Sequence, residues 1–128
     1  VDFVTPETSK PGPVEIKSLN VVAQPLKFIQ FLLKDVQRAV VMSDAGVAQL
    51  ITVPAPARYA AHKLIVAASR PAEQKAKSKK DINQFLALAE VLPEDEINEA
   101  ISLAANAGPG WKSRLASSLK VAGQLSRL

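Results

Sequence analysis

The stretch PAPARYAAHKLIVAASRPAEQKAKSKKD, residues 54–81, decides the fold of this chain. Pro56 suits the first position of an α-helix, because a residue there has no helical partner for its backbone N–H in any case. Pro71 disfavours helical geometry at the residue before it. We therefore expect one helix over residues 56–69 and a second, longer helix over residues 72–92.

Positive charge is concentrated in this stretch. Residues 58–80 hold seven basic side chains and one acidic side chain, a net charge of +6, whereas the formal net charge of the whole chain is +4. The rest of the chain is therefore net negative. A basic run of this density needs either an anionic partner or full solvation.

The N-terminal part contains short runs of alternating character. Alternation of apolar and polar residues predicts strands over residues 1–4 and 14–17. Residues 20–23 form either a third extended piece or a turn. Residues 25–35 carry apolar side chains at the spacing of a short amphipathic helix, with Pro25 near its start.

A hairpin and further helices are predicted next. Two β-rich runs, residues 38–43 and 47–53, flank a short loop that contains Gly46, which is the pattern of a β-hairpin. Pro93 and the acidic residues after it predict the start of another helix. A last helix carries apolar residues at helical spacing from Trp111 onward.

These elements predict an α+β protein. Short N-terminal strands and a hairpin precede a four-helix, mainly α C-terminal bundle. We divide the chain into an α+β part, residues 1–53, and a helical C-terminal region, residues 54–128.

Composition narrows the classes of function. With 128 residues, 48% of them hydrophobic, the chain fits one mainly helical domain. The absence of cysteine excludes disulfides, thiolate metal sites and thiol nucleophiles. The single histidine, His62, excludes multi-histidine zinc chemistry from this chain alone. No apolar run reaches the roughly 20 residues of a membrane helix, so we expect a cytoplasmic protein without membrane association.

Asp2 is the first residue with a candidate chemical role. It lies between apolar residues in a predicted strand, where a buried carboxylate would need a partner. Either the chain end is exposed and Asp2 is solvated, or Asp2 is a ligand for a hard cation such as Mg²⁺.

The first predicted helix places Lys63 and Arg70 on one face. Either these cations are solvated, with their aliphatic stems on the core, or they form a clamp for phosphate groups. In the next helix, Asp81 is spaced to pair with Lys77, four residues earlier. His62 has no Ser, Cys or Asp nearby in the sequence with which to form a catalytic pair, so a structural role is expected for it.

Two segments resemble known nucleotidyltransferases. VDFVTP, residues 1–6, is similar to the strand that holds the third catalytic carboxylate in nucleotidyltransferases of the DNA polymerase beta superfamily. VPAPARYAAHKLIVAASRP and the later KAKSKKDINQFLALAEVL resemble the helical portion of a bacterial group with this fold, related to abortive-infection toxin-type nucleotidyltransferases. The shared pattern is Ala-x-Lys, then an Arg, then Lys-Asp, here Ala61-His62-Lys63, Arg70 and Lys80-Asp81.

The resemblance implies a phosphoryl-transfer site in which two Mg²⁺ ions position an NTP. By this comparison Asp2 is the third metal-binding carboxylate, and Lys63, Arg70, Lys80 and Asp81 line or support the nucleotide cleft. The Gly-Ser turn and Asp-x-Asp motif that supply the first two carboxylates in the family are missing here. The comparison therefore implies that the chain is the C-terminal part of a longer protein, begins within a truncated lobe, and is inactive by itself.

Two hypotheses of function follow. In the first, the chain is part of a nucleotidyltransferase that moves a nucleotide from NTP to an unknown acceptor, either RNA or protein. In the second, it is a non-catalytic helical interaction domain whose basic residues 58–80 bind nucleic acid or an acidic protein. Nucleotide binding in the presence of Mg²⁺ distinguishes the first hypothesis, and salt-sensitive RNA binding distinguishes the second.

Overall fold

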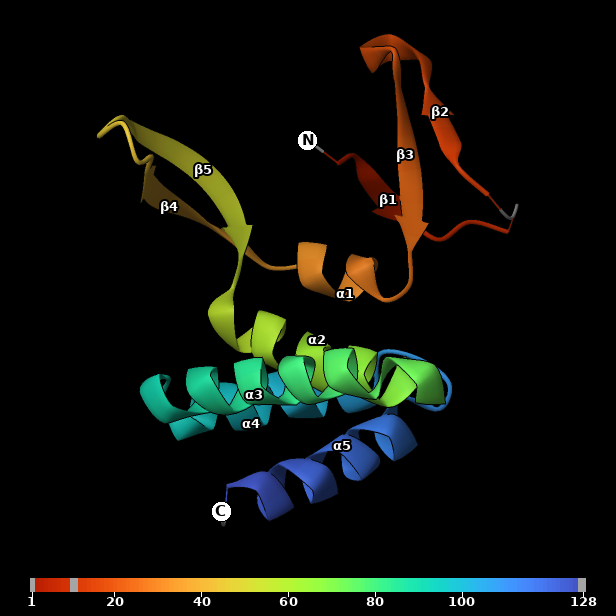
Figure 1. Ribbon diagram of the computed structural model, residues 1–128, viewed down its shortest axis with the longest axis vertical. Helices are drawn as coiled ribbons and strands as arrows, with labels where there is room; N and C mark the ends of the chain where they lie inside the picture. The colour runs from red at the N-terminus through yellow and green to blue at the C-terminus, as the bar shows by residue number, and fades with distance from the viewer. Residues whose placement is uncertain (1, 10–11, 127–128) are drawn as a thin grey trace.

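Two groups of strands stand on one side of a layer of helices (Figure 1). The computed structural model describes residues 2–9 and 12–126 of the chain. Its strands are β1 (Val4–Pro6), β2 (Val14–Ile16), β3 (Val21–Leu26), β4 (Val36–Met42) and β5 (Ala48–Pro54), and its α-helices are α1 (Ile29–Leu33), α2 (Pro56–Ser69), α3 (Lys75–Val91), α4 (Glu94–Ala105) and α5 (Trp111–Leu125). The chain is a mixed α+β protein, as the sequence predicted.

The first three strands form one sheet in the order β1-β3-β2. β1 is parallel to β3, and β2 is antiparallel to it. The strand predicted over residues 1–4 is displaced, because β1 begins at Val4 and continues through Pro6, while residue 1 lies outside the described residues. Pro6 is tolerated there because β1 is an edge strand. Its open side has no neighbouring strand that would need a hydrogen bond from the missing N–H.

The helix predicted over residues 25–35 is much shorter in the structure. β3 runs on through Pro25 and Leu26, which pair with Thr5 and Pro6 of β1, and α1 contains only Ile29–Leu33. For these two residues, pairing with β1 outweighed the local helical pattern. The third extended piece, predicted as an alternative to a turn, is therefore the central strand of this sheet.

The predicted hairpin is present. β4 and β5 are antiparallel over their whole length, with Val40 opposite Leu50. The turn is closed where the Gly46 N–H donates to the Ser43 carbonyl oxygen at 2.8 Å. Gly46 has a φ of +77°, a conformation that favours glycine. The hairpin extends away from the helices in Figure 1 and exposes Val40 and Met42.

Helix α2 is the centre of the helical layer. It packs against α3, α4 and α5, and α1 also contacts it. α3 packs chiefly on α2 and α5, and much less on α4, which follows it in the chain. Four helices thus follow the hairpin within the described residues, but the predicted four-helix bundle is not confirmed by this arrangement.

The core is built around the buried face of α2. Leu64 and Ile65 are fully buried, and the small side chains of Ala60 and Ala61 allow neighbouring helices to approach closely. The Ser118 hydroxyl donates to the Leu64 carbonyl oxygen at 2.7 Å and so ties α5 to α2. None of the helices in the described part of the chain has the length and apolar character that crossing a membrane requires.

Candidate functional site

A pocket of about 500 Å³ opens where the end of β3, the start of α1 and the C-terminal half of α2 meet. We call it the larger pocket. Its lining includes the apolar side chains of Phe28, Leu32 and Val66 and the basic residues Lys63 and Arg70. The two cations that the sequence singled out on α2 therefore lie at one cavity.

A buried carboxylate holds these two cations. Lys63 Nζ donates to Asp81 Oδ1 at 3.3 Å, and Arg70 Nε donates to Asp81 Oδ2 at 2.6 Å. Arg70 Nη1 also donates to Gln74 Oε1 at 3.2 Å. We call these four residues, Lys63, Arg70, Gln74 and Asp81, the Asp81 cluster.

Helix ends explain this geometry. α2 stops at Ser69 because Pro71 follows, and Arg70 is extended, with φ −74° and ψ 139°. The 3-10 turn Ala72–Gln74 then leads directly into α3. This tight connection brings the Asp81 carboxylate of α3 against the C-terminal half of α2.

Burial makes the Asp81 cluster more than a surface ion pair. Asp81 is 3% exposed, whereas the side chains of Lys63 and Arg70 are 17% and 27% exposed. A buried carboxylate needs partners for its charge, and here each oxygen has one. With two cations on one anion, the cluster keeps a net charge of +1 beside the larger pocket.

His62 lies next to this cluster and also lines the larger pocket. Burial and, to a smaller extent, the positive charge of Lys63 together lower the pKa of His62 from 6.5 to about 4, although Asp81 and the Lys27 backbone act in the opposite direction. Neither ring nitrogen has a partner with hydrogen-bond geometry among the described residues. The imidazole is therefore neutral at pH 7.

The remaining predicted site residues are placed differently. Lys80 is exposed on α3 and does not line the larger pocket. The predicted pairing of Lys77 with Asp81 is wrong, because both oxygens of Asp81 turn to Lys63 and Arg70 on the neighbouring segment. Asp81 itself, predicted to bind the cofactor, has both oxygens engaged in holding the two cations.

Asp2 is exposed and precedes β1. Glu7, at the other end of β1, is the acidic residue that lines the larger pocket. At about 3.3 Å per residue, the five residue steps from Asp2 to Glu7 correspond to about 16 Å of extended backbone. Asp2 is therefore at the end of β1 that points away from the pocket.

The described residues do not fit a two-metal centre. Over residues 2–9 and 12–126, no group of three or more His, Asp or Glu side chains is placed to hold a metal ion. The implied Mg²⁺ ions would need several carboxylate oxygens, and Asp2 supplies one carboxyl group. We therefore derive no step through a metal.

Most of the residues that line the larger pocket were not predicted from the sequence, and three of them show why. Gln74 could have been noticed, because it lies four residues after Arg70. Phe28 and Glu7 carry no such signal, since β-sheet pairing brings their segments to α2. Arg58, which was counted in the basic stretch, serves another purpose: its Nη1 donates to the Phe31 carbonyl oxygen at 3.1 Å and holds α1.

Comparison with known proteins gives one match. A family model described as nucleotidyltransferase matches residues 1–107, which covers both groups of strands and helices α1 to α4. No curated protein and no solved structure matches the chain at a significant level. The match includes every residue of the Asp81 cluster and ends before α5. The chain belongs to this nucleotidyltransferase family.

Proposed function

We propose that this chain binds the nucleoside triphosphate of a nucleotidyl-transfer reaction in the larger pocket, with Lys63 and Arg70 facing the phosphates. One observation carries the proposal: both cations line the pocket while a single buried carboxylate, Asp81, holds them in position. Prearranged cations bind an anion more tightly than mobile surface lysines do, because their side-chain entropy is already lost.

The Asp81 cluster keeps donors for a ligand. The guanidinium of Arg70 has five N–H groups, and the contacts with Asp81 and Gln74 occupy only Nε and part of Nη1. Lys63 has three N–H groups, of which one points to Asp81. Its ammonium also lies 4.8 Å from the centre of the Tyr59 ring, a contact that restricts its motion.

The rest of the larger pocket suits a nucleoside. Phe28, Leu32 and Val66 offer an apolar wall, and ligand pockets typically combine such walls with a few fixed polar groups. The volume of about 500 Å³ is within the range of small-molecule sites.

The finer sequence prediction, membership of the DNA polymerase beta superfamily, is part of this proposal. In the reaction of that class, a hydroxyl oxygen of the acceptor forms a bond to the α-phosphorus of NTP, and its proton passes to the solvent. The bond from that phosphorus to the bridging oxygen breaks, and pyrophosphate leaves with the electron pair. Our proposal assigns to this chain the binding of the triphosphate, with Lys63 and Arg70 neutralising its charge.

Calorimetric titration with ATP, GTP, CTP and UTP, with and without Mg²⁺, tests the proposal. We expect saturable binding of at least one nucleotide. Lys63→Ala should weaken this binding tenfold or more, since loss of a charge-assisted contact is worth about 1.5–3 kcal/mol. Arg70→Lys keeps the charge but loses the planar donor group, so it should also weaken binding.

The matched control is Lys79→Ala, which removes the same charge from an exposed position on α3. Its nucleotide affinity should stay within twofold of the unchanged protein. Denaturation curves of each variant show whether it is folded. The proposal is wrong if no nucleotide binds, or if Lys79→Ala weakens binding as much as Lys63→Ala.

A second candidate, nucleic-acid binding, has its own supporting observation. Lys75, Lys77, Lys79 and Lys80 are exposed on the first turns of α3, where the positive end of the helix dipole makes further positive charge unfavourable. An RNA backbone would neutralise them. RNA binding can be measured with the same variants. This candidate is favoured if the RNA affinity falls steeply with salt, is lost in Lys79→Ala and does not change when nucleotide is added.

A further inference from the structure

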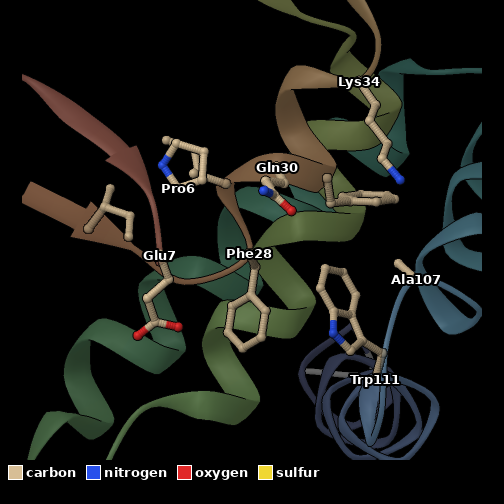
Figure 2. Close-up of a pocket in the computed structure, with 10 residues that line it drawn as sticks. Pro6, Glu7, Phe28, Gln30, Lys34, Ala107 and Trp111 are labelled. Carbon is tan, nitrogen blue, oxygen red and sulfur yellow. The ribbon is translucent and has the colours of Figure 1, made fainter. Parts of the chain in front are cut away.

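A second, smaller pocket of about 220 Å³ adjoins the larger one. We call it the aromatic pocket (Figure 2). It lies between the end of β1, α1 and the corner that leads into α5, and Phe28 and Glu7 line both pockets. Trp111 and α5 lie beyond the part matched by the family model, so this pocket is not a feature of the matched region alone.

Three rings form its walls. The rings of Phe28 and Trp111 meet edge to face, with centroids 5.1 Å apart and an interplanar angle of 89°. Phe31 meets Trp111 at 5.5 Å and 64°. In such pairs the edge of one ring meets the face of the other. Phe31 is 4% exposed and Trp111 is 9% exposed, so the partly buried ring of Phe28 is the most accessible of the three to a ligand.

Phe28 is held in an unusual conformation. Its φ is +67°, in the left-handed region that bulky residues avoid. Such strain persists where the surroundings determine it and often coincides with a ligand site. Here it places the Phe28 ring on the boundary between the two pockets, against Trp111.

Charge and hydrogen-bonding groups favour a neutral ligand. Glu7 and Lys34 contribute opposite charges to the lining, whereas the larger pocket lies beside the positive Asp81 cluster. The amide of Gln30 is directed toward Phe28 and Trp111 (Figure 2). A glutamine amide donates and accepts at once, so it pairs with the edge of a ring that carries both a donor and an acceptor.

We propose that the aromatic pocket binds a neutral, planar heteroaromatic ring of nucleobase size, and that this ring belongs to the acceptor of nucleotidyl transfer. Stacking on aromatic side chains binds bases of any sequence, and Gln30 selects among them. The binding of the ring stands on the pocket alone, whereas its role as acceptor rests on the proposed function of the larger pocket.

Trp111 reports on this pocket directly, because it is the single tryptophan in the sequence. We would titrate the protein with uridine and with adenosine and follow Trp111 fluorescence. Saturable quenching is expected with at least one nucleoside. Ala107→Leu fills the pocket from an exposed position and should weaken this binding at least tenfold. Gln30→Ala should weaken it about fivefold and change the preference between the two nucleosides.

Ser102→Leu is the matched control, since it adds similar bulk at an exposed position of α4 that lines neither pocket. Its nucleoside affinity should stay within twofold of the unchanged protein. The ring-binding claim is overturned if neither nucleoside quenches Trp111, or if Ala107→Leu and Ser102→Leu act alike.

A third titration separates the acceptor role from the proposed function. The nucleoside is added in the presence of a saturating amount of the nucleotide that binds best to the larger pocket. If the nucleoside affinity stays within twofold of its value without nucleotide, the result supports two neighbouring sites. If the nucleotide competes with the nucleoside, the aromatic pocket binds the base of the nucleotide itself, and the acceptor role is overturned. If no nucleotide binds at all, the proposed function fails, and nucleoside binding blocked by Ala107→Leu still supports the ring-binding claim.

Discussion

The two ends of the basic stretch, residues 58–80, use positive charge in different ways. At the α2 end, Lys63 and Arg70 are largely buried and share one carboxylate. At the α3 end, Lys75, Lys77 and Lys79 are exposed, and none of them forms an ion pair with another described residue. A charge run that looks uniform in sequence is thus divided by burial into a fixed group and a solvated group.

This difference in burial indicates which of the basic residues affect stability and ligand binding. Fixed, half-buried cations are part of the fold, and they act on a ligand through a medium of low polarisability. Solvated lysines are screened by salt within about 10 Å and contribute little to stability. The α2 end should therefore respond strongly to mutation, and the α3 end weakly.

The largest expected effect is that of Asp81→Ala. It leaves Lys63 and Arg70 without their shared partner in a largely buried place, and breaking such a pair typically destabilises a protein by about 3–5 kcal/mol. Urea unfolding should therefore show a midpoint far below that of the unchanged protein. Glu73→Ala removes an exposed acid from the same stretch and should change the free energy of unfolding by about 0.5 kcal/mol or less. Equal effects would show that the Asp81 cluster does not hold the fold.

The elements that local sequence determines were predicted correctly, whereas those that depend on distant contacts were not. The helix over residues 56–69 was predicted with both ends correct, because Pro56 and Pro71 fix them through local covalent geometry. The hairpin was recognised from a local turn at Gly46. The boundary between β3 and α1 was wrong, because the pairing of the end of β3 with β1 depends on a segment that is distant in sequence.

The candidate site divides in the same manner. Sequence spacing put Lys63 and Arg70 on one face, and both line the larger pocket. Spacing could not reveal that Asp81 reaches back across 11 and 18 residues to pair with them. A carboxylate four residues from Lys77 looked like a local helix pair, and only the packing of α3 on α2 decides otherwise.

The second-largest expected effect concerns His62, which lies beside the fixed cations Lys63 and Arg70. Its pKa is about 4 in the folded chain and 6.5 when unfolded, so the unfolded chain binds more protons between these values. The contribution of His62 to the free energy of unfolding should therefore be fully present above pH 6.5. It should fall as the pH drops toward 4, by up to about 1.4 kcal/mol per pH unit. His62→Phe removes this titration and two unpaired ring nitrogens, so it should be at least as stable at pH 7.

The measurement is the difference between the two proteins, from urea unfolding at pH 4.5, 5.5 and 7. Taking the difference removes the pH dependence of every other group, because both proteins share those groups. Lys63 and Asp81 are the charged groups that act on His62, and the Lys27 backbone also contributes. A difference that does not change with pH would mean that His62 is solvated like the α3 lysines.

The smallest expected effect is at the solvated end, with Lys77→Glu. Lys77 lies in the first turn of α3, where a negative charge interacts favourably with the helix dipole and a positive charge does not. The exchange should raise the free energy of unfolding by about 0.5–1 kcal/mol at low salt, and the gain should shrink in 1 M salt because the charges are exposed. Lys63→Glu makes the same change of charge beside Asp81 and should instead destabilise the protein at both salt concentrations. If Lys77→Glu were as damaging as Lys63→Glu, the α3 lysines would belong to a fixed cluster of their own, and the division of the basic stretch by burial would be wrong.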